Sequence, residues 1–467
     1  MLRQLEARLG LENFPTYRQD GAGKPDIPFL PLSVVFTLSV YMLETYLDYR
    51  QHRLLKEKSP PNALLRALKA VDAENEGLNA VSKVQSKFQA SQSYGLDKSF
   101  FHFFDSGFDL VLGLVVNLSG WMPMIWDVSA GLVAKSGLER WGGDVPTSLV
   151  FVGLVLVFQT SIGLPFTLYS TFVVEERHGF NKSTLGLFFA DKVKSLLLSV
   201  VIGAPALACV LKIIEMGGRH FYIYVWGFMF SFSIIMLTIA PVLIMPLFNK
   251  YTPLEDGELK SAIEALAARV NFPLTKLFVV DGSKRSAHSN AYFYGFFKNK
   301  RIVLFDTLIK QAETQEIVSI LGHELGHWKM SHTLQGFGIT QTYMLAAFAA
   351  FGLATEMGES LRLSFGYSTP ATLITLYLFF AVVWAPVDHL LSVLMNVLSR
   401  RNEFQADAYA VKLGYAKDLQ SGLVKLQLEN LGNMNPDPWY SSFHYSHPPL
   451  VERLQAMAAA SDAKKAA

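Results

Sequence analysis

Seven long apolar segments constrain the fold of this 467-residue chain more than any other feature. A helix needs about 20 mostly apolar residues to cross a hydrocarbon core roughly 30 Å thick, and that core offers no water to unpaired backbone groups. The composition agrees, since 51% of residues are hydrophobic and 17% charged, whereas soluble proteins carry about 25% charged residues. The chain is therefore predicted to be a mainly α-helical membrane protein. The predicted spans are residues 29–47, 108–131, 148–172, 195–216, 221–247, 337–357 and 371–397.

The second predicted span is the least regular of the set. Asn117, Pro123 and Asp127 interrupt it, and Asp105 and Asp109 lie near its start. Charges inside a membrane are costly unless they face water or a partner. The acids therefore indicate either a water-filled interior or a helix that starts at the membrane interface.

An odd number of spans places the two termini on opposite sides of the membrane. Residues 48–100, 175–194 and 248–336 and the tail from Arg400 share one side and are rich in Lys and Arg. Cytoplasmic loops carry an excess of such residues, so this side is predicted to be cytosolic. The polar segment 1–28 lacks the apolar core of a cleaved signal peptide, which leaves the first span as the targeting signal.

The composition argues against a fold held by internal disulfides and against a nucleic-acid-binding protein. Cys209 is the single cysteine, so an internal disulfide is impossible. No basic run interleaved with aromatic residues suggests nucleic-acid binding.

The segment 248–336 reads as a small folded unit between the fifth and sixth spans. Residues 258–270 have helical periodicity, while 276–281, 291–296 and 301–306 are β-branched and aromatic runs bounded by turn residues. We expect an α+β unit here. The predicted organisation is a polar segment (1–28), a five-span membrane domain (29–247), and a second domain with two further spans and the tail (248–467).

The stretch ILGHELGHWKMSH, residues 320–332, carries the clearest chemical signal. His323 and His327 lie four apart, so on a helix they project from one face, where two imidazoles can bind one zinc ion. Glu324 stands where it can reach a water on that metal. The alternative is an amphipathic helix with exposed histidines. His332 lies off the metal face and is expected at the surface.

A catalytic zinc usually has three protein ligands and an open position. Two spans later the chain returns to the same side at EFQAD, where Glu403 and Asp407 share a helix face. Glu403 is the predicted third ligand, and Asp407 is predicted to orient a ligating histidine. A solvated acidic face beside Arg400 and Arg401 is the alternative.

These parts indicate peptide hydrolysis. Zinc activates water and polarises a carbonyl, Glu324 serves as general base, and a donor must stabilise the oxyanion. The candidate donors are His447 in HYSHPPLVERL and Asn290 in AHSNAYFYG, although either can be a turn residue. The strand after Asn290 can also pair with an extended substrate.

HELGH, EFQAD, SNAYFYGF, HYSHPP and LPFTLYSTFVVEERHGFNKST together resemble the type I CAAX prenyl proteases, the integral-membrane zinc metalloendopeptidases of the a-factor-converting enzyme family. The resemblance covers nearly the whole chain. It implies seven transmembrane helices around a water-filled intramembrane chamber, capped by a zinc domain, and removal of the aaX tripeptide from farnesylated C-a-a-X termini. It assigns zinc (one Zn2+) to His323, His327 and Glu403, the base to Glu324, orientation to Asp407, substrate or transition-state contact to Asn290 and His447, and a polar place near the site to Arg453.

Rival functions differ in substrate or in the role of zinc. One is a membrane quality-control zinc protease without a prenyl requirement, and another is a transporter or scaffold with a structural zinc, which would need no base at Glu324. The expected partners are prenylated CAAX proteins or peptides and the lipid bilayer, with no nucleic acid, and the chain is expected to be a monomer. The last residues, KKAA, are either a solvated tail or a dilysine retrieval signal, and the second reading predicts a multi-pass protein of the endoplasmic reticulum membrane with a cytosolic active site.

Overall fold

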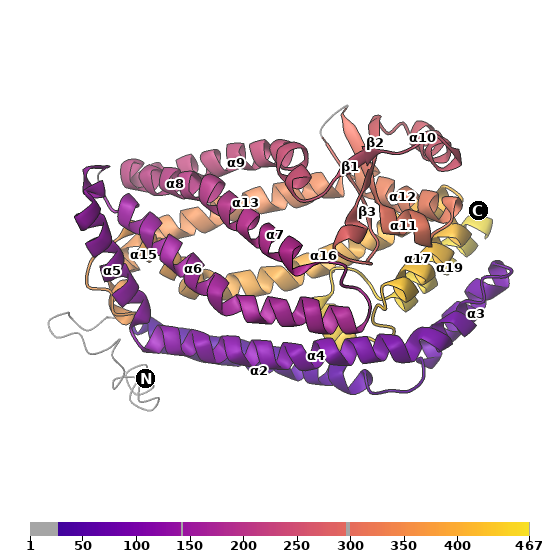
Figure 1. Ribbon diagram of the computed structural model, residues 1–467, viewed down its shortest axis with the longest axis horizontal. Coiled ribbons are helices and arrows are strands. Elements are labelled where there is room, and N and C mark those ends of the chain that lie inside the picture. Colours follow the sequence, from indigo (N-terminus) through magenta and orange to yellow (C-terminus); the bar gives the residue numbers. More distant parts are fainter. Residues whose placement is uncertain (1–26, 142, 296–298, 467) are drawn as a thin grey trace.

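The computed structural model describes residues 27–141, 143–295 and 299–466. The polar segment predicted at 1–28 thus lies almost wholly outside the described residues. Figure 1 shows long helices side by side, with a small sheet and shorter helices at one end. The elements of the first half are α2 (Phe29–Leu54), α3 (Asn62–Glu74), α4 (Ala80–Leu118), α5 (Trp121–Ser136), α6 (Val145–Tyr169), α7 (Leu185–Leu198), α8 (Ala204–Met216) and α9 (Phe221–Ile239).

The second half carries the sheet and the remaining helices. Its first elements are β1 (Tyr251–Pro253), α10 (Glu258–Val270), β2 (Leu274–Val280), β3 (Ala291–Tyr294), β4 (Lys300–Phe305), α11 (Asp306–Gln311) and α12 (Thr314–Lys329). They are followed by α13 (His332–Leu353), α14 (Gly358–Ser364), α15 (Thr372–Leu378), α16 (Ala385–Lys412), α17 (Ala416–Glu429), α18 (Pro438–His444) and α19 (Leu450–Ala466).

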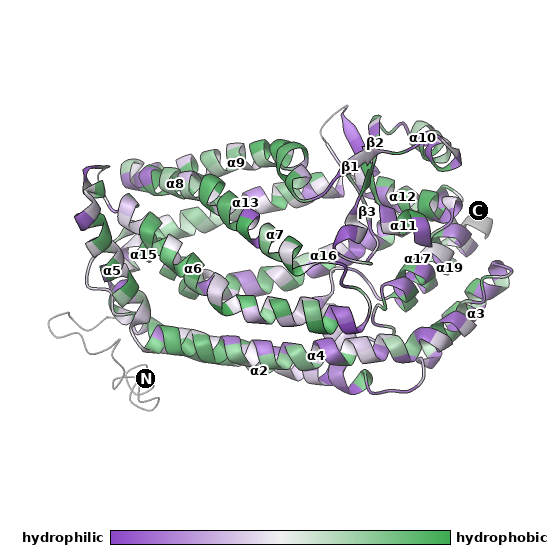
Figure 2. Cartoon of the chain, viewed as in Figure 1, coloured by the Kyte–Doolittle hydropathy of each residue, from purple (hydrophilic) through white to green (hydrophobic). Residues whose placement is uncertain are grey.

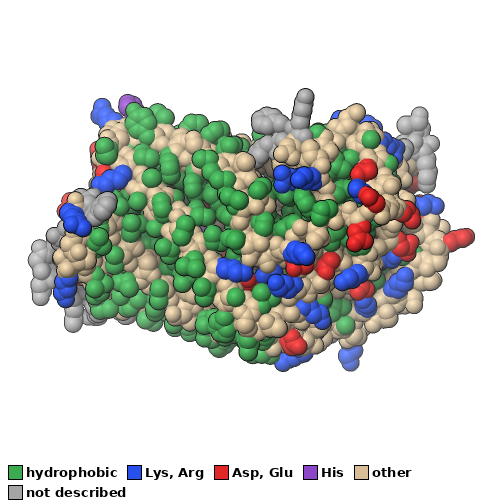
Figure 3. Space-filling view, turned by 45° about the horizontal axis from the view of Figure 1, so that its top comes forward, with side chains coloured by type: hydrophobic (Ala, Val, Ile, Leu, Met, Phe, Trp, Pro, Cys, Tyr) green, Lys and Arg blue, Asp and Glu red, His purple; other side chains and the backbone are tan. Residues whose placement is uncertain are grey.

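Within the described residues, seven helices are long and apolar enough to cross a membrane, which confirms the predicted number. They are Phe29–Leu54, Ala80–Leu118, Val145–Glu175, Leu185–Met216, Gly218–Leu247, His332–Ser364 and Thr372–Lys412. Their apolar residues dominate one end of the molecule in Figure 2. Figure 3 shows hydrophobic side chains over this end and most charged side chains over the other. The chain is a multi-pass membrane protein.

The second predicted span, 108–131, is wrong in its bounds. The helix α4 begins at Ala80, far before the apolar stretch, and ends at Leu118. Gly120 then adopts a left-handed conformation (φ 73°) before α5 starts at Trp121, a backbone state that glycine reaches without steric cost. Residues 48–100, treated above as a loop, therefore contain α3 and the first half of α4.

Few residues of the membrane helices are buried within the protein. In none of the seven most apolar windows are more than 22% of the residues buried. Helices that pack around a shared core bury a whole stripe, so this low burial fits helices that wall a chamber. Asp105 and Asp109 line a pocket of about 500 Å³ together with Gln159, Thr167 and Ser170, in keeping with a polar interior. Asp127 is exposed on α5.

The described strands form a four-stranded sheet in the order β1-β2-β4-β3. β2 and β4 run parallel, whereas β1 and β3 pair antiparallel at the two edges. The predicted helix over 258–270 and the three predicted strands are confirmed, and the short strand β1 was not predicted. Because β3 is an edge strand, one side of its backbone remains open to another chain.

The two halves of the chain share one hydrophobic core. Leu64 and Leu68 of α3 and Val84 and Phe88 of α4 are buried in the same cluster as residues of the sheet, α10, α12 and α17. The segment between the first two spans therefore helps to build the domain that follows the fifth.

Candidate metal centre

The helix α12 carries HELGH and is held firmly at its start. Glu313 and Glu316 form a capping box, in which each side chain accepts from the backbone of the other residue, and such a box satisfies two helix-end donors. Glu316 also pairs with Lys425 of α17 at 2.8 Å. The first turn of α12 is thus fixed before the chain reaches His323.

Gly326 allows the helix α16 to lie directly against α12. A Cβ atom at this position would stand 3.0 Å from the Cα atom and 3.2 Å from the carbonyl oxygen of Ala406. Ala406 is fully buried at the crossing. The small residue between the two histidines of HELGH therefore brings EFQAD within reach of them.

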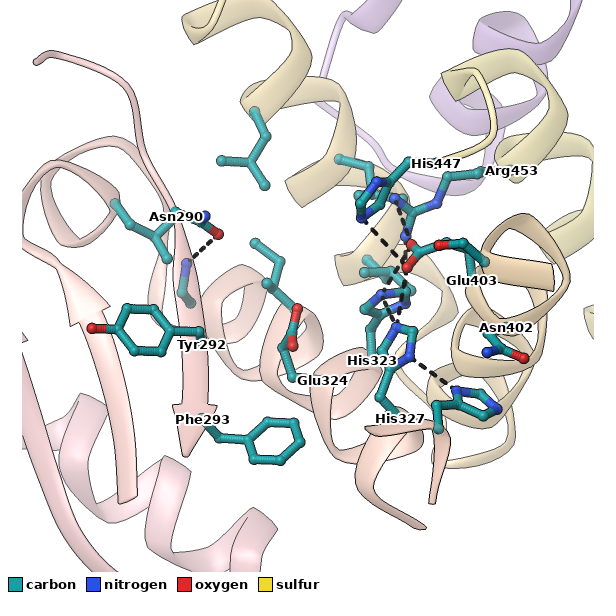
Figure 4. Close-up of a pocket in the computed structure, with 18 of the residues that line it drawn as sticks. Asn290, Tyr292, Phe293, His323, Glu324, His327, Asn402, Glu403, His447 and Arg453 are labelled. Carbon is teal, nitrogen blue, oxygen red and sulfur yellow. Dashed lines mark hydrogen bonds and ion pairs between the residues drawn. The ribbon is translucent and has the colours of Figure 1, made fainter. Parts of the chain in front are cut away.

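His323, His327 and Glu403 converge across this crossing. Their candidate donor atoms all lie within 4.8 Å of one another. The Nε2 atoms of the two histidines are 3.2 Å apart, and the Glu403 carboxylate lies 3.4 Å from Nε2 of His323 and 3.2 Å from Nε2 of His327. Figure 4 shows the three side chains pointing toward one another. The structure thus brings together the three residues predicted as ligands.

Their donor atoms are suited to a metal ion. Glu403 is 4% exposed, and its Oε2 atom is buried without a hydrogen bond. A buried carboxylate oxygen left in this state is costly, and a bound cation would remove that cost. Two imidazole nitrogens and a carboxylate oxygen are a common donor set for divalent metals.

Asp407 holds His323 from the side away from Glu403. Its Oδ1 atom lies 2.8 Å from Nδ1 of His323, and Arg453 binds both carboxylate oxygens, at 2.7 and 2.8 Å. Burial lowers the pKa of His323, but the neighbouring carboxylates of Asp407 and Glu403 outweigh that effect and raise the pKa to about 9. Asp407 therefore keeps a proton on Nδ1 and leaves Nε2 facing the cluster.

His332 is not the surface residue that we expected. It is 7% exposed, and its Nδ1 atom lies 3.0 Å from Nδ1 of His327, while its Nε2 atom lies 3.0 Å from Oε1 of Gln405. The prediction failed because it assumed that α12 continues through residue 332. Instead α12 ends at Lys329 and a tight turn redirects the chain. No sequence signal marked Gln405.

A pocket of about 580 Å³ opens beside the three candidate ligands. Glu324 lines it, and burial raises the pKa of this carboxyl group. In Figure 4, Glu324 lies between the histidines and the strand β3 with Tyr292 and Phe293. One wall is apolar and comes from α11, α12 and α17; it consists of Leu308, Ile320, Leu419, Leu423 and Leu426. The pocket therefore joins a polar centre to an edge strand and an aliphatic wall.

The two predicted oxyanion donors both line this pocket. Nε2 of His447 is 3.5 Å from Oε1 of Glu403, and its exposed ring contacts the Ser446 hydroxyl through Nδ1 at 3.0 Å. Asn290 lies across the pocket at the start of β3, where its Oδ1 atom accepts from the Ala291 backbone. His447 thus stands next to the cluster and Asn290 beside the open strand edge.

A loop of the membrane domain holds the segment that leads into β3. Asn181 forms an isolated β-bridge with Ser286, and the Ala287 backbone donates to the Phe180 carbonyl at 3.0 Å. The His288 ring stacks on Phe180, with ring centroids 4.1 Å apart. The sequence EERHGFN therefore connects the membrane helices to the pocket.

A HExxH helix and a carboxylate-bearing helix that cross at the end of seven candidate membrane spans define a class, the membrane-embedded metallopeptidases. The comparisons with known proteins agree. Residues 51–250 match the family model "CAAX prenyl protease N-terminal, five membrane helices", and residues 253–461 match peptidase family M48. The chain belongs to family M48 and carries the CAAX prenyl protease N-terminal domain, which confirms the resemblance and makes it a metalloprotease.

Relatives from several kingdoms align over nearly their full length. The chain is 47% identical over 440 residues to the CAAX prenyl protease 1 homolog of Oryza sativa subsp. japonica, covering 94% of this chain and 99% of the relative. It is 40% identical over 462 residues to the Homo sapiens homolog, covering 91% and 94%. The crystal structure of S. mikatae Ste24p superposes with a TM-score of 0.84 at 40% identity, covering 93% of this chain and 100% of that one.

Proposed function

We propose that this chain is a zinc endopeptidase that removes the aaX tripeptide from prenylated C-a-a-X termini. The observation that carries the proposal is the cluster of His323, His327 and Glu403 beside Glu324 and an open strand edge. The relatives named CAAX prenyl protease 1, aligned end to end, support this substrate class. A quality-control role without a prenyl group has no such support.

Zinc fits the spacing of the cluster. Bonds of about 2.0–2.1 Å in a tetrahedral site put neighbouring ligand atoms about 3.3 Å apart. The two Nε2 atoms are 3.2 Å apart, and Glu403 approaches them through different oxygens, with Oε1 3.2 Å from His327 and Oε2 3.4 Å from His323. In this assignment His323, His327 and Glu403 hold the ion, which acidifies a water and polarises the scissile carbonyl when bound.

The chain's own residues supply the remaining chemistry. The substrate backbone pairs with β3, and an aliphatic side chain of the tripeptide enters the wall that contains Leu419 and Leu423. Glu324 takes a proton from the attacking water and passes it to the leaving amine. The Ser446 hydroxyl donates to Nδ1 of His447, so that Nε2 carries the proton and donates to the developing oxyanion. Asn290 holds the substrate at the strand edge.

Burial of Glu324 suits it to this role. A raised pKa makes its carboxylate a stronger base than an exposed glutamate. Asp407 acts on His323, and Arg453 holds Asp407.

The site operates on the cytosolic side of the endoplasmic reticulum membrane in this proposal. Most of the charged side chains in Figure 3 lie at the end of the molecule that carries the sheet in Figure 1, and the positive-inside rule assigns the basic end to the cytosol. All the site residues come from one chain, so a monomer is sufficient.

The test compares two peptides that differ only in a farnesyl group on the C-a-a-X cysteine. Purified protein in lipid nanodiscs should cleave the farnesylated peptide and release the tripeptide, and a chelator should stop the reaction until zinc is added back. Equal cleavage of the unmodified peptide would instead support quality-control proteolysis. Cleavage that survives complete zinc removal would refute the metal centre.

A further inference from the structure

The turn between α12 and α13 places a third histidine against the candidate metal centre. α12 ends at Lys329 and α13 begins at His332, so a turn of two residues separates the helices. Ser331 adopts a left-handed conformation with φ 60°, which is uncommon for a residue with a Cβ atom. Strained backbone of this kind persists where the surrounding structure demands it. Here it returns the His332 ring to His327.

The hydrogen bonds of these rings allow one arrangement of protons when Nε2 of His327 faces a metal. Nδ1 of His327 must then carry the proton and donate to Nδ1 of His332. Since Nδ1 of His332 accepts, its proton lies on Nε2, which donates to Oε1 of Gln405. Gln405 is half-buried, and its amide oxygen can only accept. The chain of contacts therefore fixes the tautomer of His327.

The two histidines of HELGH thus have separate supports on one helix. Asp407 orients His323, and Gln405 orients His327 through His332. Glu403, Gln405 and Asp407 occupy alternate positions of EFQAD. Glu403 supplies a metal-ligand atom, and each of the other two residues supports one histidine. We propose that His332 and Gln405 are positioning residues that hold His327 in the tautomer and orientation that bind zinc. This inference rests on the metal centre proposed above.

The experiment measures zinc affinity by competition with a chromophoric chelator, using full-length protein in nanodiscs. His332→Phe removes both ring nitrogens and should weaken zinc binding about 10- to 100-fold, the usual effect of losing an outer partner of a ligating histidine. His332→Asn keeps an acceptor near the position of Nδ1 and should restore most of the affinity. Leu334→Ala, at an exposed neighbour in the same helix, is the matched control and should bind zinc as the wild type does.

A second pair of variants keeps the test decisive if His332→Phe does not fold. Gln405→Met removes the acceptor, whereas Gln405→Glu retains it at the same length. Gln405→Met should weaken zinc binding and shift the visible absorption bands of the Co2+-substituted protein, and Gln405→Glu should do neither.

The outcomes separate this inference from the metal centre itself. Wild-type protein that takes up no zinc would overturn both. Wild-type affinity together with an unchanged cobalt spectrum in Gln405→Met would overturn the positioning role alone, and so would equal losses in Gln405→Met and Gln405→Glu.

Discussion

The buried pair between Arg453 and Asp407 offers a quantitative test of how the centre is supported. Asp407 is 1% exposed, and the guanidinium group of Arg453 binds it through two short contacts, at 2.7 and 2.8 Å. Arg453→Met removes the positive charge and leaves Asp407 as an uncompensated buried anion. Asp407→Asn removes the negative charge but keeps an acceptor for His323. The double variant leaves neither charge at this place.

The expected energies follow from burial. Breaking a buried pair by removing one partner costs about 3–5 kcal/mol, because the other charge is left without compensation. Replacing both charges removes that penalty, so the free energy of unfolding of the double variant should be no lower than that of the less stable single variant. The two changes should therefore be non-additive by at least about 3 kcal/mol, at or above the upper end of the usual range for residues in contact. Arg453 also lies 3.8 Å from Glu403, so some loss will remain in the double variant.

The assay is denaturant unfolding of chelator-treated protein, followed by the fluorescence of its seven tryptophans. Removing zinc first separates the stability of the pair from any change in metal affinity. Additive losses within about 0.5 kcal/mol would refute the reasoning, since they would mean that the two groups stabilise the fold independently. Glu452→Gln, at a partly exposed ion pair with Arg400, is the control and should cost about 1 kcal/mol or less.

Three further predictions concern the reaction, the helix crossing and pH. Glu324→Gln should keep zinc but lower kcat by about 100-fold or more; zinc analysis and peptide cleavage on one sample check this, and full activity would exclude Glu324 as the base. Gly326→Val should lower both zinc affinity and thermal stability, because even a Cβ atom at this position lies 3.0 Å from the backbone of α16 and a larger side chain would push the two helices apart. Native zinc affinity in this variant would show that the close crossing is unnecessary. The pKa of His323 is about 9 in the metal-free protein, so below pH 9 zinc must displace a proton from this residue, and zinc affinity should fall about tenfold per pH unit toward pH 7. Zinc affinity that does not change between pH 9 and pH 7 would contradict the raised pKa.

Much of this architecture follows from local sequence patterns. Each membrane helix contains an apolar window long enough to span a bilayer, and the strands at 274–280 and 300–305 are short runs of β-branched and aromatic residues. His323 and His327 share a helix face through their spacing alone. These features depend on neighbours in the chain, so the sequence reveals them.

Features that depend on distant contacts or on rare backbone states were not predicted. The polar first half of α4 contains no apolar window from which a helix could be predicted. Its helix is stabilised by packing against α17 and α3, which lie elsewhere in the chain. The place of His332 depends on the left-handed conformation of Ser331. Serine seldom adopts this conformation, and no neighbouring residue in the sequence predicts it. The two short contacts of Arg453 with Asp407 arise only once α19 packs on α16.

The shared core has a practical consequence for dissecting the molecule. Removing everything before residue 248 would strip Leu64, Leu68, Val84 and Phe88 from the cluster that contains α10 and α12, and would also remove the bridge from Asn181 to Ser286. The truncated protein would expose aliphatic side chains that are now buried, and the strand beside the pocket would lose its anchor. A soluble protease cannot be cut from this chain at the end of its fifth span. Protein engineers and crystallographers will need to keep α3 and the first half of α4 with any catalytic fragment.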